Sequence, residues 1–378
     1  MDTLSMQTGQ PGLTAVAMSG GLDSSVTAWL LAQSGRPVVG LSMLLWDQSG
    51  VEAHGRCCGA LDLGDAKRVA QQAGIPHYTL RMDEEFRQKV VDPFVSDYLA
   101  GRTPSPCVRC NTWIKFDLLL ERARSFGAER VATGHYARIV DGPDGPELHT
   151  ALDAAKDQSY YLFELTREQL AASLFPLGEM TKTEVREIAR RAGLVVAEKG
   201  ESMEVCFVAG GVREFVEAQV AERPDRFAEA SARLEQPARL VDAAGDELGE
   251  GQPYYRYTVG QRRGLGLAAK SPLFVLAIEP EENRVVVGPE EELLAPGLRG
   301  ERLHWIGPDP GQPVEAVVRI RSRHPGVPAL IRPHRLSGDT GMVEIDFAEP
   351  QRGVTPGQAA VFYQGTRVLG GCWIQGRL

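Results

Sequence analysis

A run of eight residues near the N-terminus constrains the fold more than any other part of this sequence. The run is Ala17-Met18-Ser19-Gly20-Gly21-Leu22-Asp23-Ser24, and it lies between an apolar stretch at 13–16 and a helical pattern at 25–33. A strand that turns through two glycines into a helix brings backbone N–H groups and the positive end of the helix dipole to one point. No lysine follows the glycines, which distinguishes the run from the GxxxxGKS/T loop that grips β- and γ-phosphates. The sequence therefore predicts an anion site at a strand-to-helix turn.

Strand and helix patterns alternate from residue 13 to about Ala137. Strands are predicted at 37–46, 77–82 and 130–133, and helices at 61–73, 84–99 and 113–126. Repeated β-α units indicate the α/β class, with a doubly wound parallel sheet that has helices on both faces. The anion site would then lie at the carboxyl edge of the sheet, where ligands bind in such folds.

The character of the sequence changes after Cys206. One helix is predicted at 212–221, followed by Gly- and Pro-rich sequence with short strands. From about Asn283 onwards, short alternating segments at regular spacing predict a small closed β-barrel. We therefore expect three domains: an α/β domain at 12–208, a small central β-rich α+β domain at 209–284 and a C-terminal β-barrel at 285–378.

The bulk properties indicate a soluble globular protein. The 378 residues are enough for two or three domains, and 43% of them are hydrophobic and 24% charged. No apolar run approaches the ~18 residues that span a bilayer. The polar N-terminal stretch lacks the build of a signal peptide. We therefore expect a cytoplasmic protein with no membrane partner.

One local stretch is strongly basic although the net charge is −9. Between residues 317 and 335 there are two histidines, no acidic residue and five arginines: Arg319, Arg321, Arg323, Arg332 and Arg335. The negative net charge argues against whole-surface binding of nucleic acid. The arginines indicate either a patch that contacts phosphates or a solvated strand face whose partner charges lie elsewhere.

The six cysteines indicate metal or redox chemistry, because structural disulfides are rare in cytosolic proteins. Cys107 and Cys110 form a CxxC pair in a stretch where Pro104 and Pro106 predict a stiff loop rather than a helix. Such a pair can bind a metal or exchange a disulfide, but no second pair follows at the short spacing of a zinc knuckle. Cys206 lies between apolar residues, where a buried structural role is commoner. The remaining cysteines are interpreted as structural: Cys57, Cys58 and Cys372.

Several motifs occur in one order along the chain. They are the loop at 17–24, Gly134-His135-Tyr136, Lys156-Asp157-Gln158-Ser159-Tyr160, the segment around Cys206, Thr258-Val259-Gly260-Gln261-Arg262, Thr355-Pro356-Gly357-Gln358 and Leu369-Gly370-Gly371. Together they resemble the tRNA-specific 2-thiouridylases, the MnmA family within the ATP-pyrophosphatase superfamily. The resemblance extends from about Leu13 to Ile374.

The resemblance implies a two-step reaction. ATP, with Mg, adenylates the C2 oxygen of the wobble uridine of tRNA, and sulfur delivered as a persulfide then displaces AMP. Cys206 would carry the persulfide, Cys110 would release its sulfur, and Asp23 would help to place the metal. Catalysis is assigned to 12–208 and tRNA binding to the barrel. The implied sulfur donor is a cysteine desulfurase, a sulfur-relay protein or free sulfide.

The same resemblance implies the binding residues. Those for ATP are Ala17, Met18, Ser19, Gly20, Gly21, Leu22, Asp23, Ser24, Met43 and Gly134. The segment that touches the target base is Ser105, Pro106 and Cys107. The other tRNA contacts are His135, Lys156, Asp157, Gln158, Arg321, Ser322 and Gln358.

The chain departs from the family pattern at Cys107, where well-studied members carry an aspartate that is proposed as an acid–base residue. A thiol cannot simply replace a carboxylate. Cys107, Cys110 and Cys206 are similar to the three cysteines on which related tRNA thiolases hold a 4Fe–4S cluster, whose free iron binds hydrosulfide. A persulfide route and a cluster route therefore both stay open.

Two other functions compete with thiolation. An amidoligase resembling argininosuccinate or GMP synthetase would share the ATP loop, but it needs neither a cysteine pair nor a basic barrel. A non-catalytic module that binds tRNA or zinc would have no use for a pyrophosphate loop.

Overall fold

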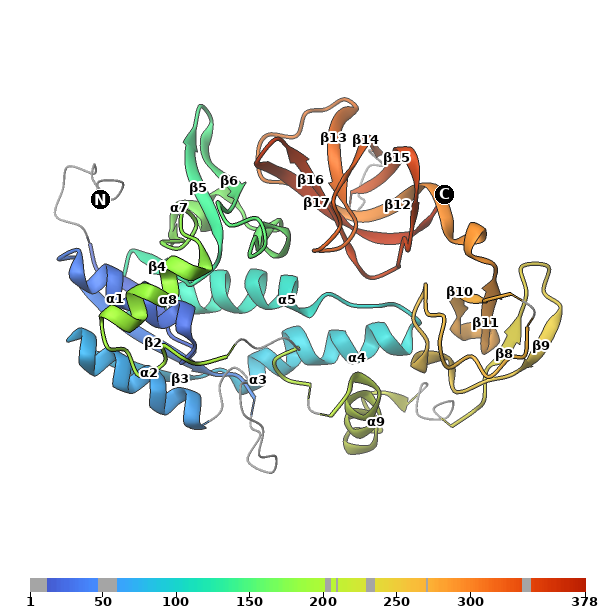
Figure 1. The fold of residues 1–378 in the computed structure, drawn as a ribbon, viewed down its shortest axis with the longest axis horizontal. Coiled ribbons are helices and arrows are strands. Elements are labelled where there is room, and N and C mark those ends of the chain that lie inside the picture. The colour runs from blue at the N-terminus through green and yellow to red at the C-terminus, as the bar shows by residue number, and fades with distance from the viewer. Residues whose placement is uncertain are drawn as a thin grey trace. The chain divides into compact units, whose positions relative to one another are not determined.

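The computed structural model describes residues 12–46, 60–200, 205–208, 210–228, 235–269, 271–334 and 341–378. The chain divides into two compact units (Figure 1). The first unit comprises Met1–Lys89 and Val108–Phe207, and the second comprises Val90–Cys107 and Val208–Leu378. Three residues singled out in the sequence lie outside the described part: Cys57, Cys58 and Arg335.

A five-stranded parallel sheet forms the centre of the first unit. Its strands, in spatial order, are β3 (His77–Arg81), β2 (Val38–Leu44), β1 (Thr14–Ala17), β4 (Arg130–Ala132) and β7 (Ser173–Leu174). The strand order reverses between β1 and β4, so the carboxyl ends of these two strands form the switch point at which doubly wound sheets bind ligands. The predicted parallel α/β sheet is confirmed.

Helices lie between the strands of this sheet along the chain, as the alternating pattern predicted, and one more helix follows its last strand. They are α1 (Leu22–Gln33), α2 (Ala60–Ala73), α3 (Asp83–Phe86), α6 (Leu119–Ser125), α7 (Arg167–Ala171) and, after the last strand, α8 (Lys182–Arg191). A hairpin of β5 (Ala137–Gly142) and β6 (Gly145–Thr150) follows β4.

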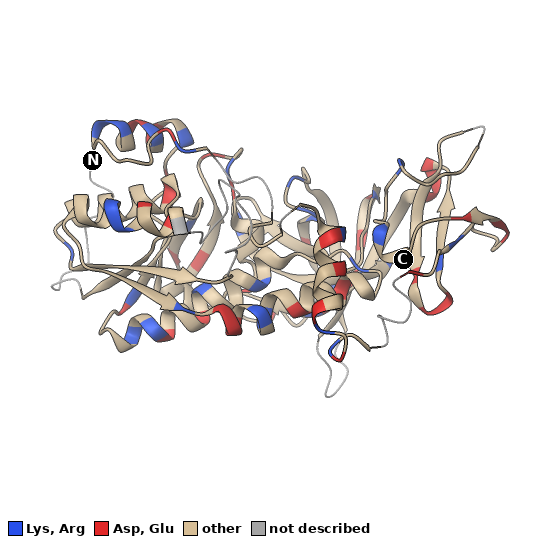
Figure 2. Ribbon diagram, turned by 90° about the horizontal axis from the view of Figure 1, so that it is seen from below, with Lys and Arg blue, Asp and Glu red and all other residues tan. Residues whose placement is uncertain are grey.

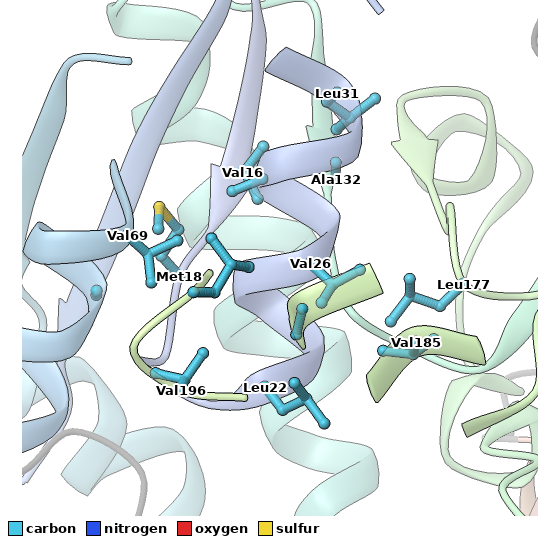
Figure 3. Packing of buried hydrophobic residues seen from close by; sticks show 14 of the residues in the cluster. Val16, Met18, Leu22, Val26, Leu31, Val69, Ala132, Leu177, Val185 and Val196 are labelled. Atoms are coloured by element: carbon cyan, nitrogen blue, oxygen red, sulfur yellow. The ribbon is translucent and has the colours of Figure 1, made fainter. Parts of the chain in front are cut away.

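The core of the first unit fixes the anion loop at both of its ends. Val16 of β1, Val69 of α2 and Val185 of α8 gather around α1 in one buried cluster (Figure 3). Met18 and Leu22, which flank the Ser19–Gly21 turn, belong to the same cluster and are 2% and 5% exposed. Burial of each large aliphatic side chain contributes about 1.5–3 kcal/mol. The turn between Met18 and Leu22 is therefore held by the core on both sides.

The prediction of a stiff loop throughout 102–111 is wrong for its second half. Residues 102–105 are non-helical, but α5 (Pro106–Arg109) is a helical turn that continues through a π-helical stretch, Cys110–Leu118, into α6. Proline is tolerated at the first helical position, because its missing N–H would have no helical partner there and its fixed φ suits a helix. Pro106 therefore begins a helix that carries both cysteines of the CxxC pair.

The described part of the second unit contains two α-helices and two all-β parts. The helices are α4 (Asp92–Leu99) and α9 (Val212–Glu222). A four-stranded sheet contains β8 (Arg239–Val241), β9 (Glu247–Glu250), β10 (Phe274–Glu279) and β11 (Arg284–Gly288), in the order β10-β11-β8-β9.

The C-terminal part of this unit is a closed six-stranded barrel, as predicted. Its strands are β12 (Leu294–Trp305), β13 (Val314–Arg319), β14 (Val327–His334), β15 (Met342–Arg352), β16 (Ala359–Gln364) and β17 (Arg367–Arg377). The strands pair in the order β12-β15-β14-β13-β16-β17, and pairing of β12 with β17 closes the barrel. Its interior is filled by aliphatic and aromatic side chains, including Val318, Ile345 and Phe362.

Lys and Arg residues are interspersed with Asp and Glu residues along the ribbon of both units (Figure 2). Among the residues that the structure describes, no helix is long and apolar enough to cross a membrane.

Candidate active site

A cavity of about 340 Å³ opens at the β1–β4 switch point of the first unit. Its size is within the range of small-molecule sites. It is lined by Ala17, Met18, Ser19, Gly21, Leu22, Asp23, Ser24, Met43, Lys115, Thr133, Gly134, His135, Tyr136, Lys156, Gln158, Lys182 and Gly200. Nine of the ten residues expected to bind ATP therefore meet in one cavity, and the tenth, Gly20, lies within the same loop.

The anion loop leaves the start of α1 open. Gly21, the residue that precedes the helix, has extended backbone, and its side chain supplies no cap. The Ser24 hydroxyl donates to the Gly21 carbonyl oxygen at 3.2 Å and accepts from the Ser19 N–H at 3.2 Å, so it closes the turn from within. The first backbone N–H groups of α1 are thus available to an anion, which the helix dipole attracts.

Two glycines permit the close packing of this site. Gly20 has φ +74°, and a Cβ on it would lie 2.0 Å from the carbonyl oxygen of Asp62 in α2. A Cβ on Gly134, just after β4, would lie 2.8 Å from the backbone N of Ser24. No side chain fits at either position without moving backbone. The loop at 17–24, called the phosphate loop from here on, therefore packs directly against α2 and against the end of β4.

A lysine from a helix far along the sequence contacts the same loop. Lys182, the first residue of α8, donates from Nζ to both Oδ1 and Oδ2 of Asp23 at 2.8 Å. The Tyr136 hydroxyl donates to Oδ1 of Asp23 at 3.0 Å. The Lys182 side chain is only 15% exposed. The sequence motifs did not include Lys182, and they included Tyr136 without assigning it a role. A lysine in the first turn of a helix is unfavourable next to the positive end of the helix dipole, and that is the signal that could have singled out Lys182.

His135 is a neutral imidazole in the cavity wall. Burial, reinforced by the nearby charge of Lys115, holds the pKa of His135 well below its usual 6.5. Its Nδ1 shares a hydrogen bond of 2.7 Å with the Thr133 hydroxyl. A neutral ring can hydrogen-bond a ligand, but it supplies no positive charge to a phosphate.

The motif at 156–160 was expected to contact tRNA and lies partly at the same cavity. Lys156 and Gln158 line it, and the Gln158 side chain accepts from the Tyr136 N–H at 3.0 Å. Asp157 instead accepts hydrogen bonds from the Ala151 N–H at 3.1 Å and from the Ser159 hydroxyl at 3.0 Å. Asp157 therefore stabilises the local turn.

The cysteines with proposed roles differ in exposure. Cys107 is exposed, Cys110 buried and Cys206 half-buried, and all three are thiols. Cys110 and Cys206 belong to the first unit, whereas Cys107 ends the first segment of the second. Phe207 packs its ring against Phe86 of α3, with 5.5 Å between centroids, which anchors the segment that carries Cys206.

The π-helical stretch that begins at Cys110 reaches the cavity at the switch point through a lysine. Asn111 donates to the Tyr161 carbonyl oxygen at 3.0 Å and accepts from Lys115 Nζ at 2.9 Å. Lys115 itself lines the cavity. The π-helical stretch thus carries Cys110 at its start and a cavity lysine on its next turn, and such stretches are frequent at functional sites.

In the second unit, the segment that precedes Cys107 is tied to the barrel. Gln358 donates from Nε2 to the carbonyl oxygens of Thr103 and Pro104, at 2.9 and 3.3 Å, and the Thr103 N–H donates to the Pro356 oxygen at 2.8 Å. Ser105 is only 6% exposed. Gln358, which was expected to contact tRNA, therefore holds the segment that leads to the CxxC helix.

The arginines of the basic stretch have different environments. Arg332 forms an ion pair with Asp346 at 2.7 Å, as expected for a strand face with partner charges. Arg319 stacks over the ring of Tyr363, 4.4 Å from its centroid. Arg321 and Arg323 are exposed and Ser322 is half-buried between them. The turn at 321–323 is therefore the part of this stretch that is best suited to contact phosphates.

Comparison with known proteins identifies the family. Models described as the HUP domain and the PRC-barrel domain of tRNA methyl transferases match residues 13–210 and 230–289, and an aminomethyltransferase β-barrel domain model matches 296–374. The tRNA-specific 2-thiouridylase MnmA of Geobacter metallireducens is 50% identical over 366 residues, covering 95% of each chain. The same-named proteins of Solibacter usitatus and Geotalea uraniireducens are 49% and 48% identical, covering 96% and 95% of this chain and 98% and 94% of their own. The chain belongs to the MnmA family.

Membership in the MnmA family supports ATP as the ligand of the cavity, and the site also suits a magnesium ion. Mg²⁺ is commonly held by one or two carboxylates together with substrate phosphates, and Asp23 supplies one carboxylate beside the phosphate loop. Both of its oxygens accept from Lys182, so a metal at Asp23 would share that carboxylate with the lysine or displace it. Within the described part of the chain, no three His, Cys, Asp or Glu side chains are grouped to hold a metal ion.

Proposed function

We propose that this chain transfers sulfur to C2 of a uridine in tRNA and uses ATP to activate the oxygen that leaves. The MnmA relatives named above are tRNA-specific 2-thiouridylases. The observation that carries the proposal is the cavity at the switch point, lined by the phosphate loop and reached by the helix of Cys110. Methyl transfer, which the description of the family models mentions, does not require a pyrophosphate loop.

In the first step, the C2 oxygen of uridine attacks the α-phosphorus of ATP. The bond from that phosphorus to the β-phosphate oxygen breaks, which gives O-adenylated uridine and pyrophosphate. The open N-terminus of α1 and the ammonium of Lys182 lie where they would stabilise the departing negative charge. Met43, from the end of β2, and Gly134 would line the adenosine side of the cavity.

In the second step, the terminal sulfur of a persulfide on Cys206 attacks C2, and AMP leaves with the former uridine oxygen. The thiolate of Cys110 then attacks Cys206 Sγ, which releases 2-thiouridine and leaves a disulfide between the two cysteines. An external thiol reductant must reopen that disulfide before the next turnover. The positions of Cys110 and Cys206 in the same unit as the ATP cavity support this route.

The alternative is hydrosulfide on a 4Fe–4S cluster held by Cys107, Cys110 and Cys206. Three thiolates are the donor set that such a cluster needs, and it would leave one iron open for hydrosulfide. Among the described residues these three side chains are not grouped to hold a metal, so they would have to come together before a cluster could form. Iron content and visible absorption after anaerobic purification separate the routes. Stoichiometric iron with a sulfur-to-iron absorption band supports the cluster, and iron-free protein that thiolates supports the persulfide.

The tRNA would contact the barrel turn at 321–323 and the segment at 105–107. Exposed Arg321 and Arg323 supply positive charge for backbone phosphates. A cysteine desulfurase or a sulfur-relay protein would supply persulfide sulfur to the first route, and free sulfide would supply hydrosulfide to the cluster route. We place the protein in the cytoplasm, because its proposed substrates, tRNA and ATP, are found there.

The function is tested by incubation of the protein with ATP, Mg²⁺, unmodified tRNA, a reductant and sulfide or a persulfide donor. We expect one 2-thiouridine, one AMP and one pyrophosphate per turnover. AMP release that depends on a small-molecule amine instead of sulfur would indicate an amidoligase. Binding of tRNA without AMP release would indicate a non-catalytic module.

A further inference from the structure

Lys199 connects three segments of the first unit outside the ATP cavity. Its Nζ donates to the Gly20 carbonyl oxygen at 2.9 Å, to Asp62 Oδ1 at 2.5 Å and to Asp65 Oδ2 at 2.7 Å. Gly20 belongs to the phosphate loop, and the two aspartates belong to α2. Lys199 itself lies seven residues before Cys206 in the sequence.

The two aspartates keep the amine of Lys199 protonated. Burial lowers the pKa of Lys199, but hydrogen bonds and charge from Asp62 and Asp65 outweigh burial and raise it above its ordinary value. The side chains of Lys199, Asp62 and Asp65 are 24%, 11% and 17% exposed. Partly buried, charge-assisted hydrogen bonds are stronger than exposed ones. These hydrogen bonds therefore attach Lys199 firmly to α2 and to the phosphate loop.

The bond to Gly20 orients the peptide that faces the phosphate site. In a trans peptide, the C=O of one residue and the N–H of the next point in opposite directions. Lys199 holds the Gly20 carbonyl, so the N–H of Gly21 points away from Lys199. Gly21 lines the ATP cavity, and Gly20 has no freedom on its other side, where Asp62 O fills the space of a Cβ.

We propose that Lys199 is a positioning residue of the phosphate loop. It holds the Gly20–Gly21 peptide in the orientation in which the Gly21 N–H faces the pyrophosphate of ATP. Because coupling of binding energies is reciprocal, ATP in the cavity would in turn stabilise the attachment of Lys199. That the anion is the pyrophosphate of ATP rests on the proposed function, whereas the orientation of the peptide by Lys199 does not.

The first test measures ATP use by Lys199→Met, with Lys67→Met as control, because Lys67 is an exposed lysine of α2. Loss of a charge-assisted hydrogen bond to the loop should raise the KM for ATP in pyrophosphate release about 10- to 100-fold. We expect kcat to change much less, Lys199→Arg to recover part of the affinity, and Lys67→Met to match the wild type. A KM for ATP in Lys199→Met equal to the wild-type value overturns the proposal.

The second test measures nucleotide binding without turnover. The Kd of a non-hydrolysable ATP analogue is measured by calorimetry in the absence of tRNA and of a sulfur donor. We expect the Kd to rise about 10- to 100-fold in Lys199→Met, to recover in part in Lys199→Arg and to match the wild type in Lys67→Met. Equal Kd values for Lys199→Met and the wild type overturn the proposal. This readout needs no tRNA thiolation, so failure of the proposed function would be seen separately.

Discussion

Lys182 donates to both carboxylate oxygens of Asp23, at 2.8 Å to each, beside the open N-terminus of α1. The one carboxylate of the phosphate loop thus holds the Lys182 ammonium beside the start of the helix. It sits over the ring of Tyr136 at 5.7 Å from the centroid, which adds a weak favourable interaction. Arrival of a pyrophosphate group would give Lys182 a second anionic partner without a large movement of its side chain.

Replacement of Lys182 by methionine should slow adenylation without unfolding the protein. Removal of one preorganised donor to developing charge costs about 10²–10³ in rate in comparable sites. Pyrophosphate release with saturating ATP and tRNA measures the effect. Arg191→Met, which removes an exposed cation from the same helix, is the matched control and should leave the rate unchanged. An unchanged rate in Lys182→Met contradicts the assigned role.

Replacement of Gly20 by alanine should abolish ATP use by steric conflict. The new Cβ would meet the Asp62 backbone oxygen at 2.0 Å, so the loop or α2 must move. Gly127 is the control, because it also has positive φ (+82°) but nothing within 4 Å of a Cβ. Gly127→Ala should cost about 1–2 kcal/mol of unfolding free energy and keep full activity. Equal activities of the two variants, measured by pyrophosphate release, would show that the close approach is unimportant.

Replacement of Cys206 by serine should separate the two steps of the reaction. The variant should lose thiolation and keep tRNA-dependent pyrophosphate release, because Cys206 does not line the ATP cavity. Cys372→Ala, which removes a fully buried thiol of the barrel, should thiolate at the wild-type rate. Normal 2-thiouridine formation by Cys206→Ser would rule out both sulfur routes.

His135 should make the first unit less stable in mild acid. Burial first, and Lys115 second, lower the pKa of His135 far below 6.5 in the folded state. The unfolded chain therefore binds a proton on this residue as pH falls below about 6.5 and the folded chain does not, so stability is present above that pH and declines below it. Between pH 7 and 5, the melting temperature of His135→Gln should fall less than that of the wild type. An identical fall would show that the folded protein protonates His135.

The sequence predicted the parallel sheet and the barrel because their signals are local and periodic. Glycines and a helix start at 20–25 define the switch point without tertiary information, and the short alternating segments after residue 283 define barrel strands. The ATP-binding candidates came instead from the family resemblance, and nine of the ten line one cavity.

The contacts that come from distant segments were not predictable in this way. Lys182 and Lys199 meet the phosphate loop from 159 and 179 residues away, and no spacing rule connects them to Asp23 or Gly20. The helical state of Cys107 and Cys110 was missed because Pro106 was interpreted as a loop former, although it occupies the first position of a helix, where proline is favoured.

The fate of the uridine oxygen tests the central claim most directly. Unmodified tRNA carrying ¹⁸O at C2 of its uridines is thiolated with ATP, Mg²⁺, a reductant and a persulfide donor or sulfide, and the products are analysed by mass spectrometry. Because adenylation makes that oxygen part of the phosphate that departs, one ¹⁸O should appear in AMP for each 2-thiouridine formed. Label recovered in water or pyrophosphate, with unlabelled AMP, would contradict activation of the C2 oxygen by adenylation.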